Sequence, residues 1–388
     1  MGSFSAAFPI PSQPVLSPAL LLAGSRRAPL PFPFNVPGVQ YTYLARNAIY
    51  WLAQHWKLRD EEILFPDFFN GAELEALLAA GVKIQFYPVH RGMRVHVQDI
   101  VDRIKPQTRA VFLIHYSGFP GPVQEVAALC RERGLLLIED CALALLSCLG
   151  DRPLGSFGDA AVFCLHKPLP VPNGGALVLR EGLNGTMLAG REPSSASVAG
   201  HVVRHLITHF EFRGKTLPLR AARALRSLGK TFTEAARVKR VAVGTSAFDA
   251  ANADIGIGRL SLRLLETLDY AEIVRRRRRN FLYLHQRLAG IVQPVFSELP
   301  PGVCPLSYPI QVEDRATVAD RLLRQGVESV PLWSRHHPLL PEGSNPEVDE
   351  LRRTVLKLPC HQDLTTKELD RVVDCFKSSL TMHLPVVN

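Results

Sequence analysis

The feature that most constrains the fold of this chain is a pair of short apolar runs, each of which ends abruptly in charged residues. Residues 135–138 (LLLI) lead to Asp140, and residues 160–165 (AAVFCL) lead to Lys167. Short uncharged runs that are rich in branched side chains are typical of buried parallel strands. The carboxyl ends of parallel strands lie at one edge of a sheet, where open α/β sheets bind ligands. The sequence therefore predicts that an acid and a lysine face one site.

A carboxylate that faces a lysine at such an edge suits pyridoxal 5'-phosphate. The lysine holds the aldehyde as a Schiff base, and the carboxylate keeps the pyridine nitrogen protonated, so that the ring acts as an electron sink. Residues 173–175 (NGG) follow the lysine and lead into a further apolar run, residues 176–179. In the alternative interpretation Asp140 caps a helix and Lys167 is a surface lysine. The two residues together with the double glycine favour the cofactor site.

The same segments are similar to those of the DegT/DnrJ/StrS sugar-aminotransferase family, which consists of fold type I enzymes that act on nucleotide-linked keto sugars. That family carries an apolar strand that ends in Glu-Asp, a Gly-Asp-Ala turn, the Schiff-base lysine after a strand, and then Gly-Gly. The resemblance covers roughly residues 35–380. The segments that carry it are IEDCALA (138–144), GSFGDAAVFCLHK (155–167), NGGALVL (173–179), ARNAIY (45–50), IQFYPV (84–89), RAVFLIH (109–115), VPLW (330–333) and LKLPC (356–360).

The resemblance implies an α/β fold of type I, with a mainly parallel sheet covered by helices on both faces and a smaller C-terminal α+β domain. It implies an aminotransferase in which Lys167 is the catalytic residue and forms the internal aldimine, with Asp140 on the pyridine nitrogen. Backbone amides at a helix start would hold the cofactor phosphate, and an aromatic side chain would stack on the ring. The implied cofactor-binding residues are Asp140, Asn47, Ala48, Phe69, Asn70, Cys164 and Lys167.

Other interpretations of some of these residues stay open at this stage. Asn47 would look the same as the cap of an ordinary helix, and Phe69 would look the same as a core residue. The turn that contains Trp333 and Arg335 to His337 resembles the family's C-terminal active-site edge, but any polar turn would look similar.

This chain departs from the family pattern in three places. Leu143 stands where many members have Gln or His. The segment before the lysine is about two residues short, so His166 directly precedes Lys167. Thr245-Ser246-Ala247 stands in place of an Asn-x-Arg segment that members send toward the neighbouring subunit. Two alternatives to the aminotransferase therefore remain: a pyridoxal-phosphate-dependent sugar dehydratase, and a catalytically reduced binding member of the same fold.

The resemblance also implies the partners of the protein. We expect a homodimer, a nucleotide-linked sugar or a related polysaccharide precursor as substrate, and glutamate as the amino donor. Isologous dimers are the commonest oligomers, and we expect the N-terminal arm or the basic segment 201–240 near the dimer interface.

The charge of the chain, formally +9, comes largely from two segments. Residues 201–240 hold ten Lys or Arg against two acids, and residues 275–279 are five consecutive arginines. No nucleic-acid-binding module accompanies them, so we expect no nucleic-acid partner. Five consecutive arginines on a helix point in all directions, and most are expected to be solvated or paired with acids. Arg220, Arg223 and Arg226 recur on one helical side and would attract a diphosphate or an anionic membrane surface.

The remaining composition excludes several classes of protein. Seven cysteines without a CxxC spacing indicate neither a zinc site nor a disulfide framework, and they fit a reducing cytoplasm. No apolar stretch reaches the length of a transmembrane segment, and the N-terminus does not read as a signal peptide. No metal-spaced cluster of His, Cys and Asp is visible, so no metal site is expected.

The length allows two domains that share one site. Residues 1–40, rich in proline, are expected to form an extended arm without a regular helix. A large cofactor-binding domain is expected over residues 41–255, with a basic insertion at 180–250. A bridging helix over 255–289 and a small domain complete residues 256–388.

Alternating helix and strand patterns fill the large domain, as expected for a parallel sheet. Gly134 is expected to end the fourth helix. Thr365 or Thr366, with Glu368, is expected to cap a last helix over 366–380. The expected helices are 42–56, 71–80, 96–104 and 122–133, and the expected strands are 62–65, 83–88, 109–114, 135–139, 160–165 and 175–179.

Overall fold

The structure is a computed structural model of the chain. It describes residues 9–26, 28–180, 190–218, 220–221, 224, 227 and 247–381. Thr245, Ser246, Arg223 and Arg226, with other parts of the basic insertion, lie outside the described residues.

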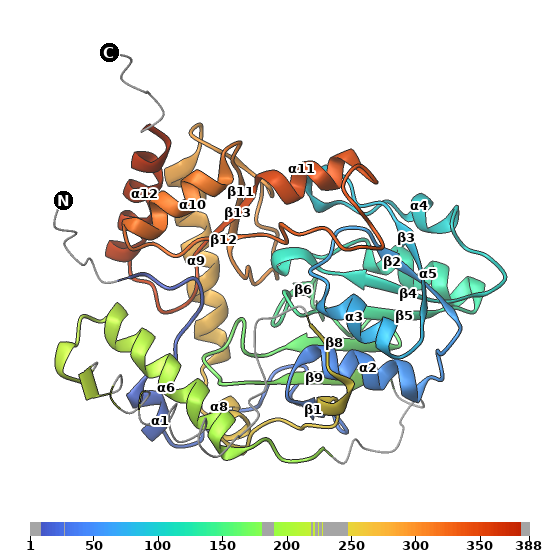
Figure 1. Ribbon diagram of the computed structural model, residues 1–388, viewed down its shortest axis with the longest axis horizontal. Helices are drawn as coiled ribbons and strands as arrows, with labels where there is room; N and C mark the ends of the chain where they lie inside the picture. The colour runs from blue at the N-terminus through green and yellow to red at the C-terminus, as the bar shows by residue number, and fades with distance from the viewer. Residues whose placement is uncertain are drawn as a thin grey trace.

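A seven-stranded sheet forms the centre of the larger part of the molecule, with the strand order β1-β9-β8-β5-β4-β2-β3 (Figure 1). Five neighbouring strands, from β3 to β8 in this order, are parallel, whereas β9 runs antiparallel to β8 and β1. The prediction of a mainly parallel α/β sheet is confirmed. The strands are β1 Gln40–Thr42, β2 Glu62–Pro66, β3 Lys83–Tyr87, β4 Thr108–Ile114, β5 Leu136–Asp140, β8 Ala160–Cys164 and β9 Gly175–Leu179.

The parallel pairing of β5 with β8 brings the acid and the lysine to the same edge. Asp140 is the last residue of β5 and pairs in register with Val162 of β8. Strand β8 ends at Cys164, three residues before Lys167. Every residue of β8 is buried, because uncharged side chains face helices or loops on both sides of the strand.

The expected helices of the large domain are present, with ends that differ by a few residues. Helix α2 packs against β8 and β9, and α5 packs against β4 and β5. Gly134 ends α5 in the left-handed conformation with φ 65°, as its place in the sequence predicts. The helices are α2 Ala45–His55, α3 Ala72–Ala79, α4 Val97–Val101 and α5 Val123–Arg133. Short additional elements are β6 Cys148–Leu149, β7 Arg152–Pro153 and the 3-10 turns Arg91–Met93, Tyr116–Gly118 and Ala250–Asn252.

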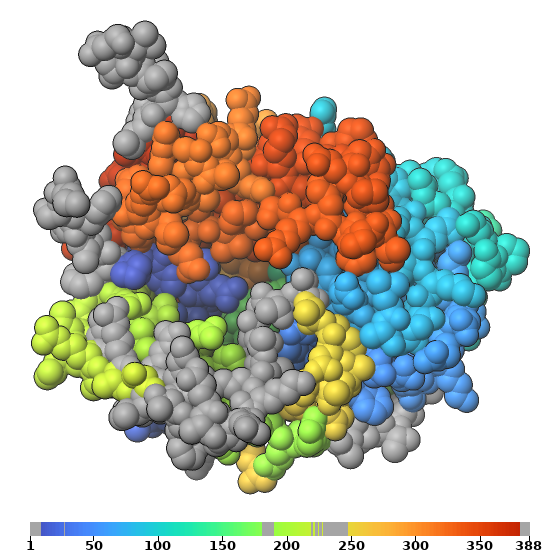
Figure 2. Space-filling view, in the orientation of Figure 1, coloured from blue at the N-terminus to red at the C-terminus, as the bar shows by residue number. Residues whose placement is uncertain are grey.

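A second, antiparallel sheet with its own hydrophobic core lies in the C-terminal part of the chain. Figure 2 shows these residues, in orange and red, above the blue and cyan residues of the larger part. The smaller α+β unit predicted from the sequence is therefore present. Its strand order is β10-β11-β13-β12, and its elements are β10 Gln293–Pro294, β11 Tyr308–Gln311, β12 Val330–Pro331, β13 Val355–Leu358, α10 Arg315–Arg324, α11 Pro346–Thr354 and α12 Thr366–Thr381.

The single bridging helix expected over 255–289 is instead two helices, α8 Arg259–Leu265 and α9 Tyr270–Leu288. Asp269 separates them because its carboxylate accepts the Glu272 N–H at 3.0 Å and so begins a new helix. The guanidinium of Arg26 also pairs with Asp269, at 2.5 Å. Helix α9 then runs from the main sheet toward α12 (Figure 1).

The cap predicted for the last helix is present. Glu368 Oε2 accepts hydrogen bonds from the Thr365 N–H and hydroxyl, at 2.6 and 2.8 Å. Both bonds run from Thr365 to one carboxylate oxygen of Glu368, and they tie the residue before α12 to the first turn of that helix.

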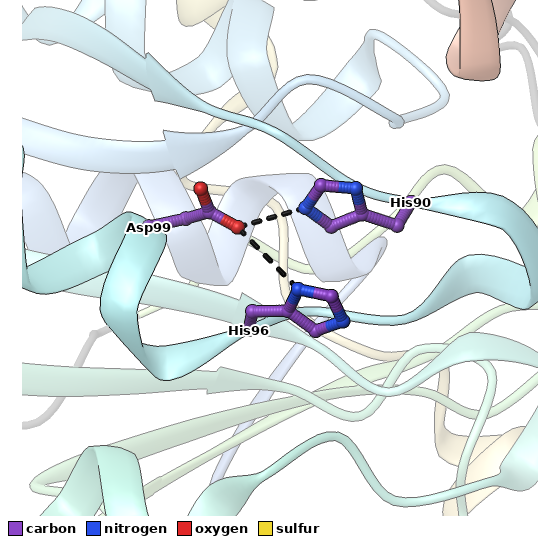
Figure 3. Close-up of side chains that lie close together, drawn as sticks. All are labelled: His90, His96 and Asp99. Carbon is purple, nitrogen blue, oxygen red and sulfur yellow. Dashed lines mark hydrogen bonds and ion pairs between the residues drawn. The ribbon is translucent and has the colours of Figure 1, made fainter.

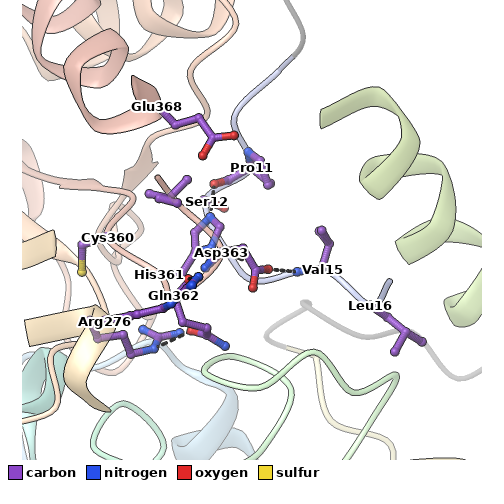
Figure 4. Close-up of polar contacts among 12 residues, drawn as sticks. Pro11, Ser12, Val15, Leu16, Arg276, Cys360, His361, Gln362, Asp363 and Glu368 are labelled. Atoms are coloured by element: carbon purple, nitrogen blue, oxygen red, sulfur yellow. Dashed lines mark hydrogen bonds and ion pairs between the residues drawn. The ribbon is translucent and has the colours of Figure 1, made fainter. Parts of the chain in front are cut away.

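The sequence predicted that the proline-rich arm contains no regular helix, and this prediction is wrong. Pro18–Leu22 form a short helix, α1, because Pro18 stands at the first helical position, where proline's missing N–H costs nothing. The arm lies against the C-terminal part of the chain: Ile10 forms a parallel bridge with Val327, and the Val15 N–H donates to Asp363 at 3.0 Å. Figure 4 shows the arm passing beside the segment that leads into α12.

The arginine run of α9 is used mainly for contacts within the chain. Arg275 and Arg276 both pair with Glu272 at 2.7 Å, as expected for arginines near an acid. Arg277 is instead fully buried and donates only to side-chain and backbone oxygens. In the basic insertion, residues Ser195–Phe212 form helix α6. Across the described residues, no helix is both long and apolar enough to cross a membrane.

Candidate active site

A cavity of about 820 Å³ opens at the carboxyl edge of the main sheet, where the two parts of the molecule meet. The main sheet contributes the ends of β5 and β8, and the small sheet contributes β12, β13 and the turn after β12. Five of the seven cofactor-binding residues predicted from the sequence line it: Asp140, Lys167, Cys164, Phe69 and Asn70.

Asp140 is a buried carboxylate with too few partners. Its Oδ1 accepts the Ala142 N–H at 2.8 Å, while Oδ2 receives no hydrogen bond from any part of the chain that the structure describes. Burial and the nearby carboxylate of Glu73 raise the pKa of Asp140 to about 7, and Lys167 opposes that rise. A carboxylate in this state is stabilised by any cation that enters the cavity.

Lys167 stands on the turn after β8, and two side chains from distant parts of the sequence fix that turn. The carbonyl of Pro168 accepts hydrogen bonds from Arg277 at 2.9 Å and from Gln362 at 3.1 Å. Within the described residues, the amine of Lys167 has no hydrogen bond or ion pair. The backbone is therefore held, while the amine stays available to a ligand in the cavity.

The double glycine after the lysine brings the start of α2 to the sheet edge. A Cβ on Gly175 would lie 2.6 Å from the Ala45 nitrogen, so only glycine allows this approach. Gly174 has φ +146°, which other residues rarely adopt. Asn173 accepts the Gly258 N–H at 2.9 Å and fastens the loop from the other side.

The start of α2 lines the cavity through residues other than those expected. Ala45 and Arg46 lie on the cavity wall, whereas Asn47 and Ala48 do not. The Asn47 side chain turns away and donates to the Asn252 carbonyl at 2.9 Å. The helix cap, Leu44, provides no side-chain hydrogen bond, as a side chain without polar atoms cannot. The first turn of α2, with the Arg46 cation, is thus the part of this helix that faces the cavity.

The loop after β2 supplies an aromatic wall. Phe69 stacks on Phe86 with 5.8 Å between ring centroids, and it also lines the cavity. The neighbouring Asn70 N–H donates to Glu73 at 2.8 Å. Glu73 is a buried acid on the cavity wall that the sequence analysis did not single out, although it follows Phe69 and Asn70 closely.

Arg352, which the sequence analysis also missed, joins the two sides of the cavity. Its guanidinium, from α11, donates to the carbonyls of Trp333 and Arg335 at 2.7 and 2.9 Å, and to that of Phe69 at 3.3 Å. It also lies 5.3 Å from the Phe68 ring centroid. Burial lowers the pKa of Arg352. No local motif marks it, because its partners lie outside its own helix, and Phe69 lies far away in the sequence.

Three further side chains crowd around the lysine. Burial and the charge of Lys167 lower the pKa of His166 to about 4, so its imidazole is neutral near pH 7. Its Nδ1 lies 3.5 Å from Cys164 Sγ, and burial raises the pKa of that thiol. Lys357 of β13 is a second lysine on the cavity wall, and burial with repulsion from Lys167 lowers its pKa to about 8.

The positions at which the chain departs from the family pattern also reach the cavity. Leu143 lines it as a nearly buried apolar residue, and Ala247 also lines it. The turn of Trp333 forms the opposite rim together with His336 and His337. His337 Nε2 lies 3.1 Å from Glu75, which anchors this rim to α3.

The residues present fit pyridoxal phosphate. Asp140 is an under-partnered carboxylate at which a protonated ring nitrogen would be stabilised, and Lys167 offers an amine in the same cavity. Arg46 and the first turn of α2 provide positive charge and backbone N–H groups for the phosphate.

Comparison with known proteins gives a consistent result. The sequence model of the DegT/DnrJ/EryC1/StrS aminotransferase family matches residues 48–377. A dTDP-4-dehydro-2,3,6-trideoxy-D-glucose 4-aminotransferase of Saccharopolyspora spinosa is 25% identical over 355 residues, which are 84% of this chain and 79% of that protein. GDP-perosamine synthase of Vibrio cholerae is 31% identical over 121 residues, 30% of this chain and 33% of that protein.

Solved structures share the fold. The putative sugar aminotransferase Spr1654 of Streptococcus pneumoniae, in its PLP form, has a TM-score of 0.70 at 14% identity, covering 97% of this chain and all of that chain. The sugar aminotransferase CalS13 of Micromonospora echinospora has a TM-score of 0.64 at 22% identity, with 95% and 99% of the two chains covered.

Proposed function

The chain belongs to the DegT/DnrJ/EryC1/StrS aminotransferase family, and we propose that it transfers an amino group to a keto group on a nucleotide-linked sugar or a related polysaccharide precursor. Pyridoxal phosphate is the proposed cofactor. The observation that carries the proposal is the pairing, in one cavity, of the under-partnered carboxylate of Asp140 with the amine of Lys167.

When bound, pyridoxal phosphate supplies an electron sink for the bond changes at the amine-bearing carbon. Asp140 holds the ring nitrogen protonated, because its buried charge is compensated only when a cation lies beside it. Lys167 would hold the cofactor covalently. The first turn of α2, with Arg46, would bind the phosphate, and Phe69 would support the ring from the loop after β2.

Lys167 is also the proposed proton carrier of the reaction. The turn that carries this amine is held, because Arg277 and Gln362 donate to the Pro168 carbonyl. An amine held there would serve as a general acid–base group at the substrate carbon. His166, neutral near pH 7, lies beside the lysine and adds no competing positive charge.

The charges at the cavity suit an anionic substrate. Arg46, Arg335 and Lys357 line the same cavity as Lys167 and come from three separate segments of the chain. A nucleotide-linked sugar carries a diphosphate, which cationic side chains attract and orient. The names of two relatives, which act on dTDP-linked or GDP-linked sugars, support this class of substrate.

Partners and location follow from the same proposal. We propose glutamate as the amino donor, a homodimer as the assembly, and the cytoplasm as the location. The seven free thiols support a reducing compartment. We also propose that residues 41–255 and 256–388 are the two domains, since each holds a sheet and a hydrophobic core.

The two alternatives, a sugar dehydratase and a binding protein without catalysis, predict different residues in the cavity. In sugar dehydratases that resemble this family, histidine replaces the lysine. Here His166 lies beside Lys167 and does not replace it. A binding protein without catalysis is favoured by Leu143, which offers no polar group on the cavity wall. The lysine and the acid together favour the aminotransferase.

The proposal is tested by following the half-reaction. Full-length protein loaded with pyridoxal phosphate is mixed with glutamate, and mass spectrometry measures conversion of the cofactor to its amine form. Lys167→Ala should abolish conversion, whereas Leu282→Ala, at an exposed position on α9, should leave it unchanged. Undiminished conversion in Lys167→Ala would contradict the proposal, and absence of conversion with every common amino donor would favour the binding protein.

A further inference from the structure

A group of three metal-ligating side chains lies away from the cavity, on the segment that joins β3 to α4. His90 Nε2 lies 2.8 Å from Asp99 Oδ2, and His96 Nδ1 lies 3.9 Å from the same oxygen. Figure 3 shows both imidazoles turned toward that carboxylate oxygen. One donor atom from each residue lies within 4.8 Å of the other two.

We propose that His90, His96 and Asp99 bind a divalent transition-metal ion of the zinc class, with water as a further ligand. Two imidazole nitrogens and one carboxylate oxygen are a common ligand set for zinc, and three protein ligands leave a position for water. Imidazole nitrogen favours zinc, copper and nickel over calcium or magnesium, which prefer oxygen.

The separations of the donor atoms agree with such an ion. Ligands at about 2.0–2.2 Å from a tetrahedral zinc lie roughly 3.3 Å from one another. The observed distances of 2.8 and 3.9 Å to Asp99 Oδ2 lie on either side of that value. At 3.9 Å the contact of His96 with Asp99 is too long for a hydrogen bond, and the His96 ring is stacked on the His90 ring with 4.3 Å between their centroids.

Other side chains lie beside the proposed ligands His90 and Asp99, as residues commonly do around a metal site. The second ring nitrogen of His90, Nδ1, lies 3.4 Å from Glu347 of α11. A carboxylate on the far nitrogen fixes the tautomer and orientation of a ligating histidine. The other oxygen of Asp99 lies 3.8 Å from the Arg103 guanidinium, which orients this carboxylate in the same way.

A second group of potential ligands, His115, Glu139 and Cys141, is not proposed as a metal site. Glu139 already accepts three backbone N–H groups, and His115 is bonded at both ring nitrogens. All three side chains are completely buried. This group is satisfied by the protein itself and has no access for an ion, in contrast to the partly exposed group at His90.

Metal binding at this site would join the loop after β3 to α11. The Arg91 N–H already donates to Glu347 at 2.7 Å, and the Arg91 guanidinium pairs with Glu350 at 2.9 Å. Helix α11 also carries Arg352, which ties the rim of the cavity together. The expected role is therefore structural: the ion stabilises the contact between the two parts of the molecule.

The test is titration of the full-length, metal-stripped protein with zinc chloride by isothermal calorimetry. His96 is mostly exposed, so His96→Gln leaves the fold intact while it removes a ligand. Loss of an outer-shell partner typically weakens binding about 10- to 100-fold, so we expect that loss for Glu347→Gln and a larger one for His96→Gln. His55→Gln, at an exposed histidine on α2, is the matched control and should bind zinc as the wild type does.

Two further readouts make the outcome decisive. Zinc should raise the thermal midpoint of the wild type and of His55→Gln, but not that of His96→Gln. Cobalt(II) should give the visible absorption of a four-coordinate site in the wild type and in His55→Gln, but not in His96→Gln. Equal zinc affinity in the wild type and in His96→Gln, binding that disappears only when thiols are blocked, or no binding at all would each overturn the proposal.

Discussion

Asp140→Asn should make the cofactor-free protein more stable at alkaline pH, even though it should impair the proposed reaction. Burial and the neighbouring Glu73 carboxylate raise the pKa of Asp140 to about 7, from an ordinary value of 3.8. At 1.36 kcal/mol for each pH unit, this difference corresponds to about 4 kcal/mol of folding free energy. An amide in the same place carries no charge and avoids this cost.

The raised pKa of Asp140 determines in which pH range the wild type is less stable than Asp140→Asn. Below about pH 4 the carboxyl is protonated in both the folded and the unfolded chain, so the raised pKa has no effect there. Between pH 4 and about 7 the unfolded chain loses the proton while the folded chain keeps it, and the stability of the wild type falls. Above about pH 7 the loss is complete, so the advantage of Asp140→Asn should be largest there and amount to at most about 4 kcal/mol.

Urea unfolding at pH 5 and pH 8, followed by circular dichroism, measures this difference. Asp159→Asn is the matched control, because Asp159 accepts the Leu137 N–H at 2.8 Å and pairs with Arg180 at 2.5 Å. That variant should lose stability at both pH values. Saturation with pyridoxal phosphate should favour the wild type again, since the ring nitrogen compensates the Asp140 charge. An Asp140→Asn protein that is less stable than the cofactor-free wild type at pH 8 would refute the reasoning.

Three further changes test the contacts that build the site. Arg352→Ala should lower the free energy of unfolding by about 3 kcal/mol or more, because it leaves several buried carbonyls without donors, and thermal denaturation would measure it. Gly175→Ala should weaken pyridoxal phosphate binding measured by fluorescence titration, because the new methyl group would lie 2.6 Å from the Ala45 nitrogen; unchanged affinity would argue against the role of the α2 start. Asp269→Ala removes the cap of α9 and should cost about 1 kcal/mol in urea unfolding, with cofactor affinity unaltered.

Much of the fold could be predicted because its signals are local. Each strand of the main sheet is a short apolar run between turn residues, and the capping residues of α5 and α12 stand beside the helices that they end or begin. The break between α8 and α9 was missed because Asp269 lies inside a continuous helical pattern. Its capping role depends on a backbone conformation that the pattern does not reveal.

The candidate site was predictable only where a chemical motif marked it. Asp140 ends β5 and Lys167 closely follows the neighbouring strand β8, so the topology of a parallel sheet brings them together. Glu73 and Arg352 carry no motif. Glu73 lies close to Phe69 and Asn70 in the sequence, whereas the place of Arg352 at the cavity depends on packing against parts of the chain far away in sequence. Asn47 stands at the expected helix, but the side of α2 that faces the cavity could not be read from the sequence.

The group formed by His90, His96 and Asp99 also could not be predicted from a sequence motif. Its spacing, with His96 six residues and Asp99 nine residues after it, matches no common zinc motif. The turn around Gly92, in the left-handed conformation at φ 70°, folds the segment back and brings the rings within 4.3 Å of each other. The outer-shell acid, Glu347, comes from a helix about 250 residues away along the chain.

The central claim is that Lys167 is the residue that holds the cofactor, and borohydride reduction tests it most directly. Full-length protein loaded with pyridoxal phosphate is reduced, digested and mapped by peptide mass spectrometry, with unreduced protein as the control. Lys357 lines the same cavity and is the natural competitor. The account predicts a pyridoxyl group on Lys167 and an unmodified Lys357; a pyridoxyl group on Lys357 or on any other lysine, with Lys167 unmodified, would contradict it.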